Sequence, residues 1–342
     1  MKANQRRIGE VNGQDIFCSE LTNGNNVKVC ISNFGATITA ILVPDKKGSI
    51  TNTVLAYDSP DECLDDRFYI GATVGRVAGR ISKGAFSIEN KVYRLPQNDG
   101  NSGNHLHGGI DGFNKRIFEI ESLDCNDQNA AVQMYYRSND REEGYPGNLD
   151  VWVTFELTEE NELIIRYKAQ TDKPTHVNLT NHSYFNLGGA NGNALEQTLF
   201  VNADKFLVTD ENYIPTGKTK EVKDTLNDFR SPKKINAYNL QESANGYNGY
   251  FILNRDKSKY DELPDAILFD PVTERKMEVI TSLPGLVFYS GEYLSGKFDK
   301  FAGVCLETQF FPDTPNRPEF NGTLLMPGQT YNEYTVLKFS YG

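Results

Sequence analysis

The sequence predicts an all-β protein made of two stacked antiparallel sheets, and three features of its 342 residues support this fold class. Apolar and polar residues alternate along many short segments, as they do in strands that bury one face. Asn-Gly and Asp-Gly pairs, which favour tight hairpin turns, separate these segments. Almost no segment carries apolar residues at helical spacing. We therefore expect very little helix.

Three segments show the alternation most clearly. In Val151–Leu157 the odd-numbered residues are apolar and share one face, while the even-numbered residues take the other. Tyr331–Phe339 follows the same pattern, and Leu163–Lys168 follows it less regularly. One turn of helix is expected at Asp224–Phe229. Turns are expected at Asn23-Gly24, Asp99-Gly100, Asn191-Gly192, Asn245-Gly246 and Asn321-Gly322.

The predicted organisation is a single domain spanning residues 1–342, because no linker, composition change or tandem repeat divides the chain. A chain of this size buries enough apolar surface to fold without disulfides or a structural metal. Its five cysteines are scattered, odd in number and never spaced as Cys-x-x-Cys. This pattern argues against a disulfide framework and against a zinc ribbon. The cysteines are Cys18, Cys30, Cys63, Cys125 and Cys305.

Charge and hydropathy limit the partners of the protein. The net charge is −11 and the isoelectric point is about 5.0. Phosphate backbones repel such a surface, and no basic stripe offsets it, so we expect no binding to nucleic acid. No run approaches the roughly 20 apolar residues of a membrane helix, and the N-terminal residues lack the apolar core of a secretory signal. We expect no membrane association and a cytoplasmic location.

The four histidines lie in two segments rich in small and polar residues, 101–109 and 176–185. Histidine is the side chain best suited to exchange protons near neutral pH. If 105–107 is a strand, His105 and His107 share a face and form a possible two-histidine metal edge. A third close ligand is missing from the sequence, so we expect no metal there.

Glu307 interrupts an apolar stretch, where an unpaired carboxylate is costly or becomes protonated. It either points to solvent or is a base with a tuned pKa. The glycine-rich segment Ile70–Ile81 contains two arginines but matches no phosphate-binding loop, and serine-hydrolase and zinc-protease motifs are absent. A histidine, a glutamate and an arginine on a β scaffold suit acid–base chemistry on a neutral, hydroxyl-rich substrate.

Several ordered motifs together resemble the aldose 1-epimerase (galactose mutarotase) family, across nearly the whole chain. The resemblance implies the family's large antiparallel β-sandwich, often called a supersandwich, and a reaction without cofactor or metal that interconverts the α and β anomers of a free aldose. The motifs are 75–81 (GRVAGRI), 106–109 (LHGG), 112–115 (GFNK), 143–147 (EGYPG), 181–187 (NHSYFNL), 228–230 (DFR), 284–285 (PG), 288–289 (FY) and 306–309 (LETQ).

The resemblance also implies residue roles. Glu307 is expected to remove the proton from the anomeric hydroxyl, and His182 to protonate the ring oxygen. Arg80 and His107 are expected to bind the sugar and hold the reactive geometry. Three other residues are expected to be structural: Arg76 as the partner of a carboxylate or a backbone carbonyl, together with His105 and His176.

Other expected substrate-binding residues include departures from the family pattern. Asn248 stands where the family usually has an aspartate, and Gly79 replaces a common asparagine. Tyr184 is also expected on the substrate side. Val287 stands where many members have a glutamine, and valine cannot hydrogen-bond a hydroxyl. These changes lead to the hypothesis that the preferred sugar is not the usual galactose or glucose but a pentose or a modified hexose.

Two alternatives remain at this stage. An epimerase of phosphorylated hexoses has the same fold but needs basic residues at the pocket rim, and the acidic chain shows no such cluster. A non-catalytic carbohydrate-binding protein keeps the pocket without turnover, but binding alone does not require both His182 and Glu307. The expected partner is a small monosaccharide, and the resemblance indicates a monomer or a homodimer.

Overall fold

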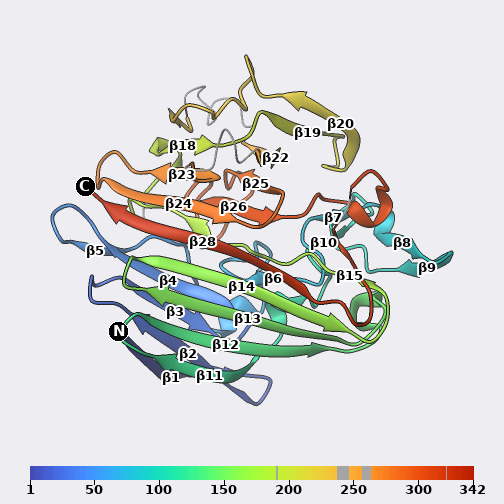
Figure 1. The fold of residues 1–342 in the computed structure, drawn as a ribbon, viewed down its shortest axis with the longest axis horizontal. Coiled ribbons are helices and arrows are strands. Elements are labelled where there is room, and N and C mark those ends of the chain that lie inside the picture. The colour runs from blue at the N-terminus through green and yellow to red at the C-terminus, as the bar shows by residue number, and fades with distance from the viewer. Residues whose placement is uncertain (190–191, 237–245, 256–262, 321) are drawn as a thin grey trace.

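The computed structural model describes residues 1–189, 192–236, 246–255, 263–320 and 322–342 (Figure 1). The predicted turns at Asn191, Asn245 and Asn321 therefore fall on residues outside this part. The described residues confirm the all-β prediction, because their helices are short 3-10 turns. These turns are Asp61–Cys63, Ser82–Gly84, Phe113–Lys115, Glu142–Gly144, Ala194–Glu196 and Thr314–Asn316.

The largest sheet has nine strands, all antiparallel to their neighbours. In spatial order the strands are β11 (Glu119–Cys125), β12 (Asn129–Ser138), β13 (Leu149–Thr158), β14 (Glu162–Thr171), β28 (Tyr331–Tyr341), β24 (Arg275–Thr281), β23 (Ala266–Phe269), β18 (Thr198–Val201) and β21 (Lys233–Lys234). The last strand of the chain lies in the middle of this sheet, between β14 and β24 (Figure 1).

Two further sheets make up the rest of the sandwich, and an isolated bridge between Val54 and Phe185 connects the regions around them. The five-stranded sheet contains β1 (Lys2–Val11), β2 (Gln14–Thr22), β3 (Lys28–Ser32), β4 (Thr37–Pro44) and β5 (Ile50–Asn52). The six-stranded sheet contains, in spatial order, β17 (Tyr184–Phe185), β26 (Val304–Gln309), β25 (Gly285–Tyr289), β22 (Asn248–Ile252), β19 (Lys205–Thr209) and β20 (Pro215–Glu221).

All three sheets contribute side chains to one apolar cluster, for example Val29, Val153 and Leu306. Burial alternates strictly along β13, as the sequence pattern predicts, because every second side chain enters this cluster. The sandwich therefore has a nine-stranded layer facing a layer that is divided into two sheets. Whether residues 1–342 form a single domain stays a prediction.

Short two-stranded pairs connect the sheets and position the loops at one end of the sandwich. They are β7 (Arg80–Ile81) with β10 (His105–Leu106), β6 (Thr73–Val74) with β16 (Thr180–Asn181), β15 (Thr175–His176) with β27 (Leu324–Leu325), and β8 (Ala85–Ile88) with β9 (Lys91–Arg94).

One predicted element is wrong and two predicted turns are confirmed. Asp224–Phe229 forms successive turns and no helix, with Thr225 Oγ1 donating a hydrogen bond to the carbonyl of Val222. Such local bonds compete with helix formation. Turns occur at Asn23-Gly24 and Asp99-Gly100 as expected. Among the described residues, no helix is long and apolar enough to cross a membrane.

Candidate active site

A pocket of about 420 Å³ opens where the six-stranded sheet meets the loops around β7 and β10. This volume is within the range of about 300–1,000 Å³ that is typical of small-molecule sites. All seven residues that the sequence assigns to catalysis or substrate binding line it: Gly79, Arg80, His107, His182, Tyr184, Asn248 and Glu307. Segments far apart in the chain thus meet at one concave site.

Glu307 lies in the middle of β26, between β17 and β25, and its residue is 3% exposed. The next residue on the strand, Thr308, turns to the opposite face and bonds Thr335. Among the described groups, Glu307 Oε2 has no hydrogen-bond partner. Burial raises the pKa of this carboxyl to about 8, although the positive charge of Arg80 lowers it. The alternative that Glu307 points to solvent is therefore wrong.

His182 follows β16, and its backbone N–H bonds the carbonyl of Ala72 next to β6. Its Nε2 lies 3.6 Å from Glu307 Oε1, and both side chains are about 5% exposed or less. The other ring nitrogen, Nδ1, lies 3.6 Å from Cys305 Sγ. Burial lowers the pKa of His182 to about 4. The acid and base expected from the sequence are thus neighbours, and both side chains are buried.

His107 reaches the pocket because the chain leaves the strand there. β10 ends at Leu106, and His107 has φ 49°. The prediction that His105 and His107 share a face is wrong for this reason. His105 instead contacts the carbonyl of Pro96 and the hydroxyl of Tyr145, so its expected structural role fits its position.

The backbone N–H of Gly79 donates a hydrogen bond to His107 Nδ1 at 3.2 Å. In the neutral imidazole only one nitrogen carries a proton, so this bond places the proton on Nε2. Burial and the neighbouring His182 hold the pKa of His107 well below its usual value. His107 therefore presents a neutral N–H donor.

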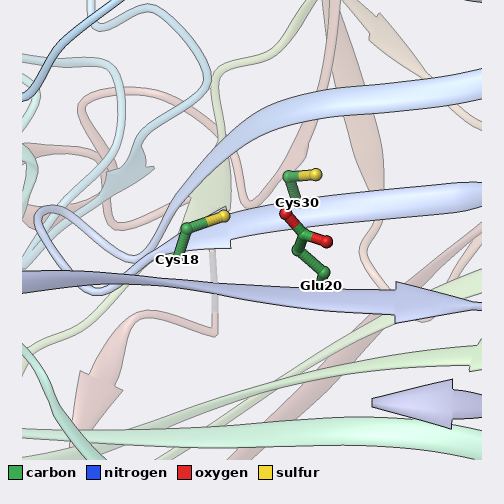
Figure 2. Close-up of side chains that lie close together, drawn as sticks. All are labelled: Cys18, Glu20 and Cys30. Carbon is green, nitrogen blue, oxygen red and sulfur yellow. The ribbon is translucent and has the colours of Figure 1, made fainter. Parts of the chain in front are cut away.

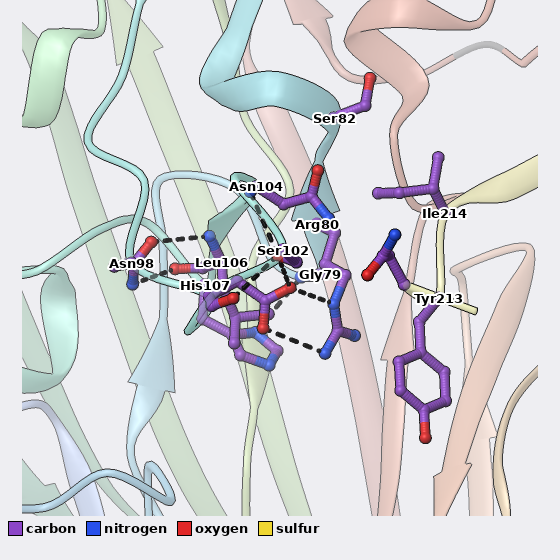
Figure 3. Close-up of polar contacts among 12 residues, drawn as sticks. Gly79, Arg80, Ser82, Asn98, Ser102, Asn104, Leu106, His107, Tyr213 and Ile214 are labelled. Atoms are coloured by element: carbon purple, nitrogen blue, oxygen red, sulfur yellow. Dashed lines mark hydrogen bonds and ion pairs between the residues drawn. The ribbon is translucent and has the colours of Figure 1, made fainter. Parts of the chain in front are cut away.

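Arg80 is fixed by a carboxylate at the pocket wall (Figure 3). Its Nε donates to Asp99 Oδ2 at 2.8 Å and its Nη2 to Oδ1 at 3.4 Å. Ser102 Oγ donates to the same Oδ2 at 2.9 Å. The guanidinium also lies 4.8 Å from the ring centre of Tyr213. These contacts hold the planar group in one orientation and leave donors for a ligand.

We predict that Asp99→Asn raises KM roughly 10–100-fold with a smaller change in kcat, because a hydrogen bond between charged groups contributes about 1.5–3 kcal/mol. Asp99 then acts as a positioning residue for Arg80. Steady-state kinetics measures the split between KM and kcat. Asp124→Asn, on the exposed edge of β11, is the matched control and should change neither. Equal kinetics for the two variants would contradict this role.

The pocket also brings together a set of potential metal ligands. One atom each of His107, His182 and Glu307 lies within 4.8 Å of the others. This set does not contain His105, so it differs from the two-histidine edge considered from the sequence, and its other members, His182 and Glu307, come from distant segments. Two imidazoles and a carboxylate also suit acid–base chemistry without a metal, and the expectation of no metal stays a prediction.

The remaining residues singled out in the sequence either line the pocket or are buried away from it. Asn248 lines the pocket from β22, and Val287 lines it from β25 as the cross-strand partner of Glu307. Arg76 is buried elsewhere and donates to the carbonyls of Pro146, Ser138 and Asn139, as expected of a structural arginine. The ring of His176 contacts the hydroxyl of Thr323.

Sequence comparison places the chain in a known family. The family model described as aldose 1-epimerase matches residues 18–338. The chain belongs to the aldose 1-epimerase family. It is 40% identical to the galactose mutarotase of Mus musculus over 325 residues, 92% of each chain. It is 34% identical to the aldose 1-epimerase of Escherichia coli (strain K12) over 341 residues, 96% of each chain.

Solved structures of this family agree with the fold. The galactose 1-epimerase from Lactobacillus acidophilus NCFM superposes with a TM-score of 0.87 at 30% identity, covering 99% of this chain and 98% of that one. The family homologue from C. elegans superposes with a TM-score of 0.84 at 29% identity, covering 94% and 98%. The sandwich predicted from the sequence, and the isomerase class that goes with this family, are both confirmed.

Sequence reasoning missed several residues that line the pocket. Tyr69 packs its ring against His107 and His182, with centroids 4.8 and 5.8 Å away. Gln309 lies two residues after Glu307 on the same face of β26, and its buried Oε1 has no partner among the described groups. The period of two around Glu307 could have indicated Gln309. No local signal marks Tyr69.

Proposed function

We propose that the protein is an aldose 1-epimerase that interconverts the α and β anomers of a free aldose, with Glu307 as general base and His182 as general acid. The observation that carries this proposal is the buried pair at the pocket wall. Two oxygens there, Glu307 Oε2 and Gln309 Oε1, are buried without a hydrogen-bond partner among the described residues. Buried polar atoms need partners, and sugar hydroxyls would supply them.

The chemistry requires one proton to leave and one to arrive. Glu307 takes the proton of the anomeric hydroxyl while His182 gives a proton to the ring oxygen. The bond between the anomeric carbon and the ring oxygen breaks, which leaves an open-chain aldehyde. Rotation about the first carbon–carbon bond presents the other carbonyl face, and reclosure with reversed proton transfers gives the other anomer. His107 Nε2–H and Arg80 hold the sugar oxygens during these steps.

The number of protons bound by His182 and Glu307 supports these roles. Between a pKa of about 4 for His182 and about 8 for Glu307, the two groups share a single proton. Moving that proton from Glu307 to His182 creates the carboxylate base and the imidazolium acid together. No proton is exchanged with solvent in this step, and the charges formed are 3.6 Å apart, where they stabilise each other.

We predict a bell-shaped dependence of kcat/KM on pH, with limbs near the pKa of His182, about 4, and that of Glu307, about 8. Adding a proton removes the base, and losing the shared proton removes the acid, so activity falls on both sides. Polarimetric rates across this range measure the profile. His182→Gln should abolish the acidic limb in the residual activity. An unchanged acidic limb in this variant would contradict the assignment.

The pocket disfavours the two alternatives. A phosphorylated sugar needs an excess of positive charge. The pocket lining has two arginines against three carboxyl residues: Arg67 and Arg80 against Asp99, Glu211 and Glu307. Arg80 is also paired with Asp99. A protein that only binds sugar has no use for an acid and a base at 3.6 Å. The preferred sugar is less constrained. Asn248 lacks the charge of an aspartate and Val287 lacks the hydrogen-bonding groups of a glutamine, which favours a pentose or a modified hexose.

Polarimetric relaxation of freshly dissolved pure anomers tests the proposal. We expect acceleration with galactose, glucose, xylose, arabinose or fucose, and the fastest sugar defines the preference of the pocket. A folded protein that accelerates none of them is not an epimerase of these free aldoses. Equal rates on galactose and glucose, with nothing faster, would reject the altered preference alone. A cytoplasmic location and a monomeric or dimeric state remain part of the proposal.

A further inference from the structure

A second group of potential metal ligands lies on the five-stranded sheet, away from the candidate active site. Cys18 and Glu20 are on β2, and Cys30 is on β3. One ligand atom of each lies within 4.8 Å of the other two. Figure 2 shows the three side chains gathered across the two strands. None of the three lines the pocket around Glu307.

Strand pairing explains why these residues meet although their sequence spacing suggests no metal motif. Cys18 and Glu20 are two residues apart on one strand and therefore share a face. Cys30 is the direct cross-strand partner of Glu20, so its side chain projects from the same face. Both cysteines are buried, at 2% and 8% exposure, and line a cavity of about 630 Å³.

We infer that Cys18, Glu20 and Cys30 bind a thiophilic divalent cation, with zinc as the best match. Zinc takes thiolate and carboxylate ligands in tetrahedral geometry at about 2.3 and 2.0–2.2 Å, which puts ligand atoms roughly 3.5 Å apart. Small side-chain movements bring the three atoms from within 4.8 Å to that spacing. Two sulfurs favour zinc over magnesium or calcium. The fourth position remains for water from the cavity.

The charges around the site are compatible with a divalent ion. Arg6 Nε donates to Glu20 Oε1 at 2.8 Å, and Lys28 Nζ donates to Oε2 at 3.5 Å. A carboxylate has about four lone-pair sites, so Glu20 can keep these bonds and still coordinate a metal. Two thiolates and the carboxylate carry three negative charges, which Arg6, Lys28 and the cation together balance to within one charge.

Binding is a simple exchange of protons for metal. Two sulfur–zinc bonds form, and two thiol protons leave to solvent. The ion then joins β2 to β3 on the face opposite the Leu21 and Val29 side chains of the core. Because the unfolded chain does not hold these ligands together, bound zinc at free concentration c should stabilise the folded state by RT ln(1 + c/Kd) and so raise the unfolding temperature with the logarithm of the zinc concentration.

Titration of the full chain with cobalt(II), followed by displacement with zinc, tests the inference. We expect one equivalent to produce sulfur-to-metal charge-transfer absorption, which zinc abolishes. This absorption separates the site from the one formed by His107, His182 and Glu307, which offers nitrogen and oxygen ligands. Absence of the absorption in the wild-type protein would overturn the inference, whatever the fate of any variant.

Variants locate the site. Cys18→Ser and Cys30→Ser should lose the absorption, and Glu20→Gln should weaken cobalt binding at least tenfold while keeping some of it. Cys125→Ser, which changes an exposed cysteine elsewhere, is the matched control and should bind like the wild type. Thermal unfolding with and without zinc should show a rise in the control and none in Cys18→Ser. Equal absorption in all four variants would overturn the assignment.

Discussion

Glu307→Gln should reduce kcat for anomer interconversion by about 10²–10⁴, the usual contribution of a general base. Glutamine keeps the shape and burial of the side chain but cannot accept the proton of the anomeric hydroxyl. Because the change acts on the chemical step, KM should move much less than kcat. Polarimetric relaxation at several sugar concentrations separates the two constants.

Glu292→Gln is the matched control for this prediction. Glu292 is also buried, and burial raises the pKa of its carboxyl to about 7. It accepts a hydrogen bond from Ser290 Oγ, which glutamine can also accept, and it does not line the pocket. Glu292→Gln should leave kcat within a few-fold of the wild-type value. Similar losses in both variants would mean that removal of any buried carboxylate impairs this fold.

Glu307→Gln should also stabilise the folded protein at high pH. The pKa of Glu307 is about 8 in the folded protein and ordinarily 4.5, so the folded state binds more protons between these values. The free energy of unfolding therefore falls as pH rises through this interval. Glutamine removes this loss, so the melting temperature of Glu307→Gln should exceed that of the wild type above about pH 8 and approach it below about pH 4.5. A carboxylate that serves catalysis at the cost of folding stability is an example of the trade-off between stability and activity.

Much of the fold could be predicted because strand alternation is a local property. β13 and β28 extend over the segments with a period of two, and turn chemistry marks the hairpin at Asn23-Gly24. The predicted turn of helix at Asp224–Phe229 failed because local side-chain bonds hold a different set of turns. The division of the second layer into two sheets depends on which distant strands pair, and a single sequence does not contain that information.

The sequence predicted residues that line the candidate site, but it did not predict how they are arranged in space. The motifs point to Glu307 and His182, yet the pairing of β17 with β26 is what brings the segment before β17 close to Glu307. His107 was placed on the wrong face because the strand ends one residue earlier, at a left-handed conformation. Asp99 was recognised only as a turn residue, since its bond to Arg80 spans 19 positions. The Cys18 and Cys30 cluster was missed for the same reason.

Gly108→Ala should destabilise the protein by about 3–5 kcal/mol and nearly abolish activity. Gly108 has φ +88°, and an added Cβ would lie 1.7 Å from the carbonyl oxygen of Gly75 and 2.4 Å from its carbonyl carbon. Both are backbone atoms, so no rotamer change relieves the contact. The two chain segments must separate, and His107, the preceding residue, moves with them. Denaturant unfolding and polarimetry measure the two effects.

Gly103→Ala separates this contact from the cost of the backbone conformation. Gly103 has φ +73° in the loop that precedes β10, and its added Cβ meets no atom within 4 Å. A left-handed alanine costs about 1–2 kcal/mol, so this variant should lose that much stability and keep its activity. The difference in stability between the two variants then measures the cost of the contact between residues 75 and 108. If both variants lose the same stability, the backbone conformation alone explains the need for glycine at position 108. The packing of residues 75 and 108 that positions His107 beside Glu307 can then accommodate an added methyl group.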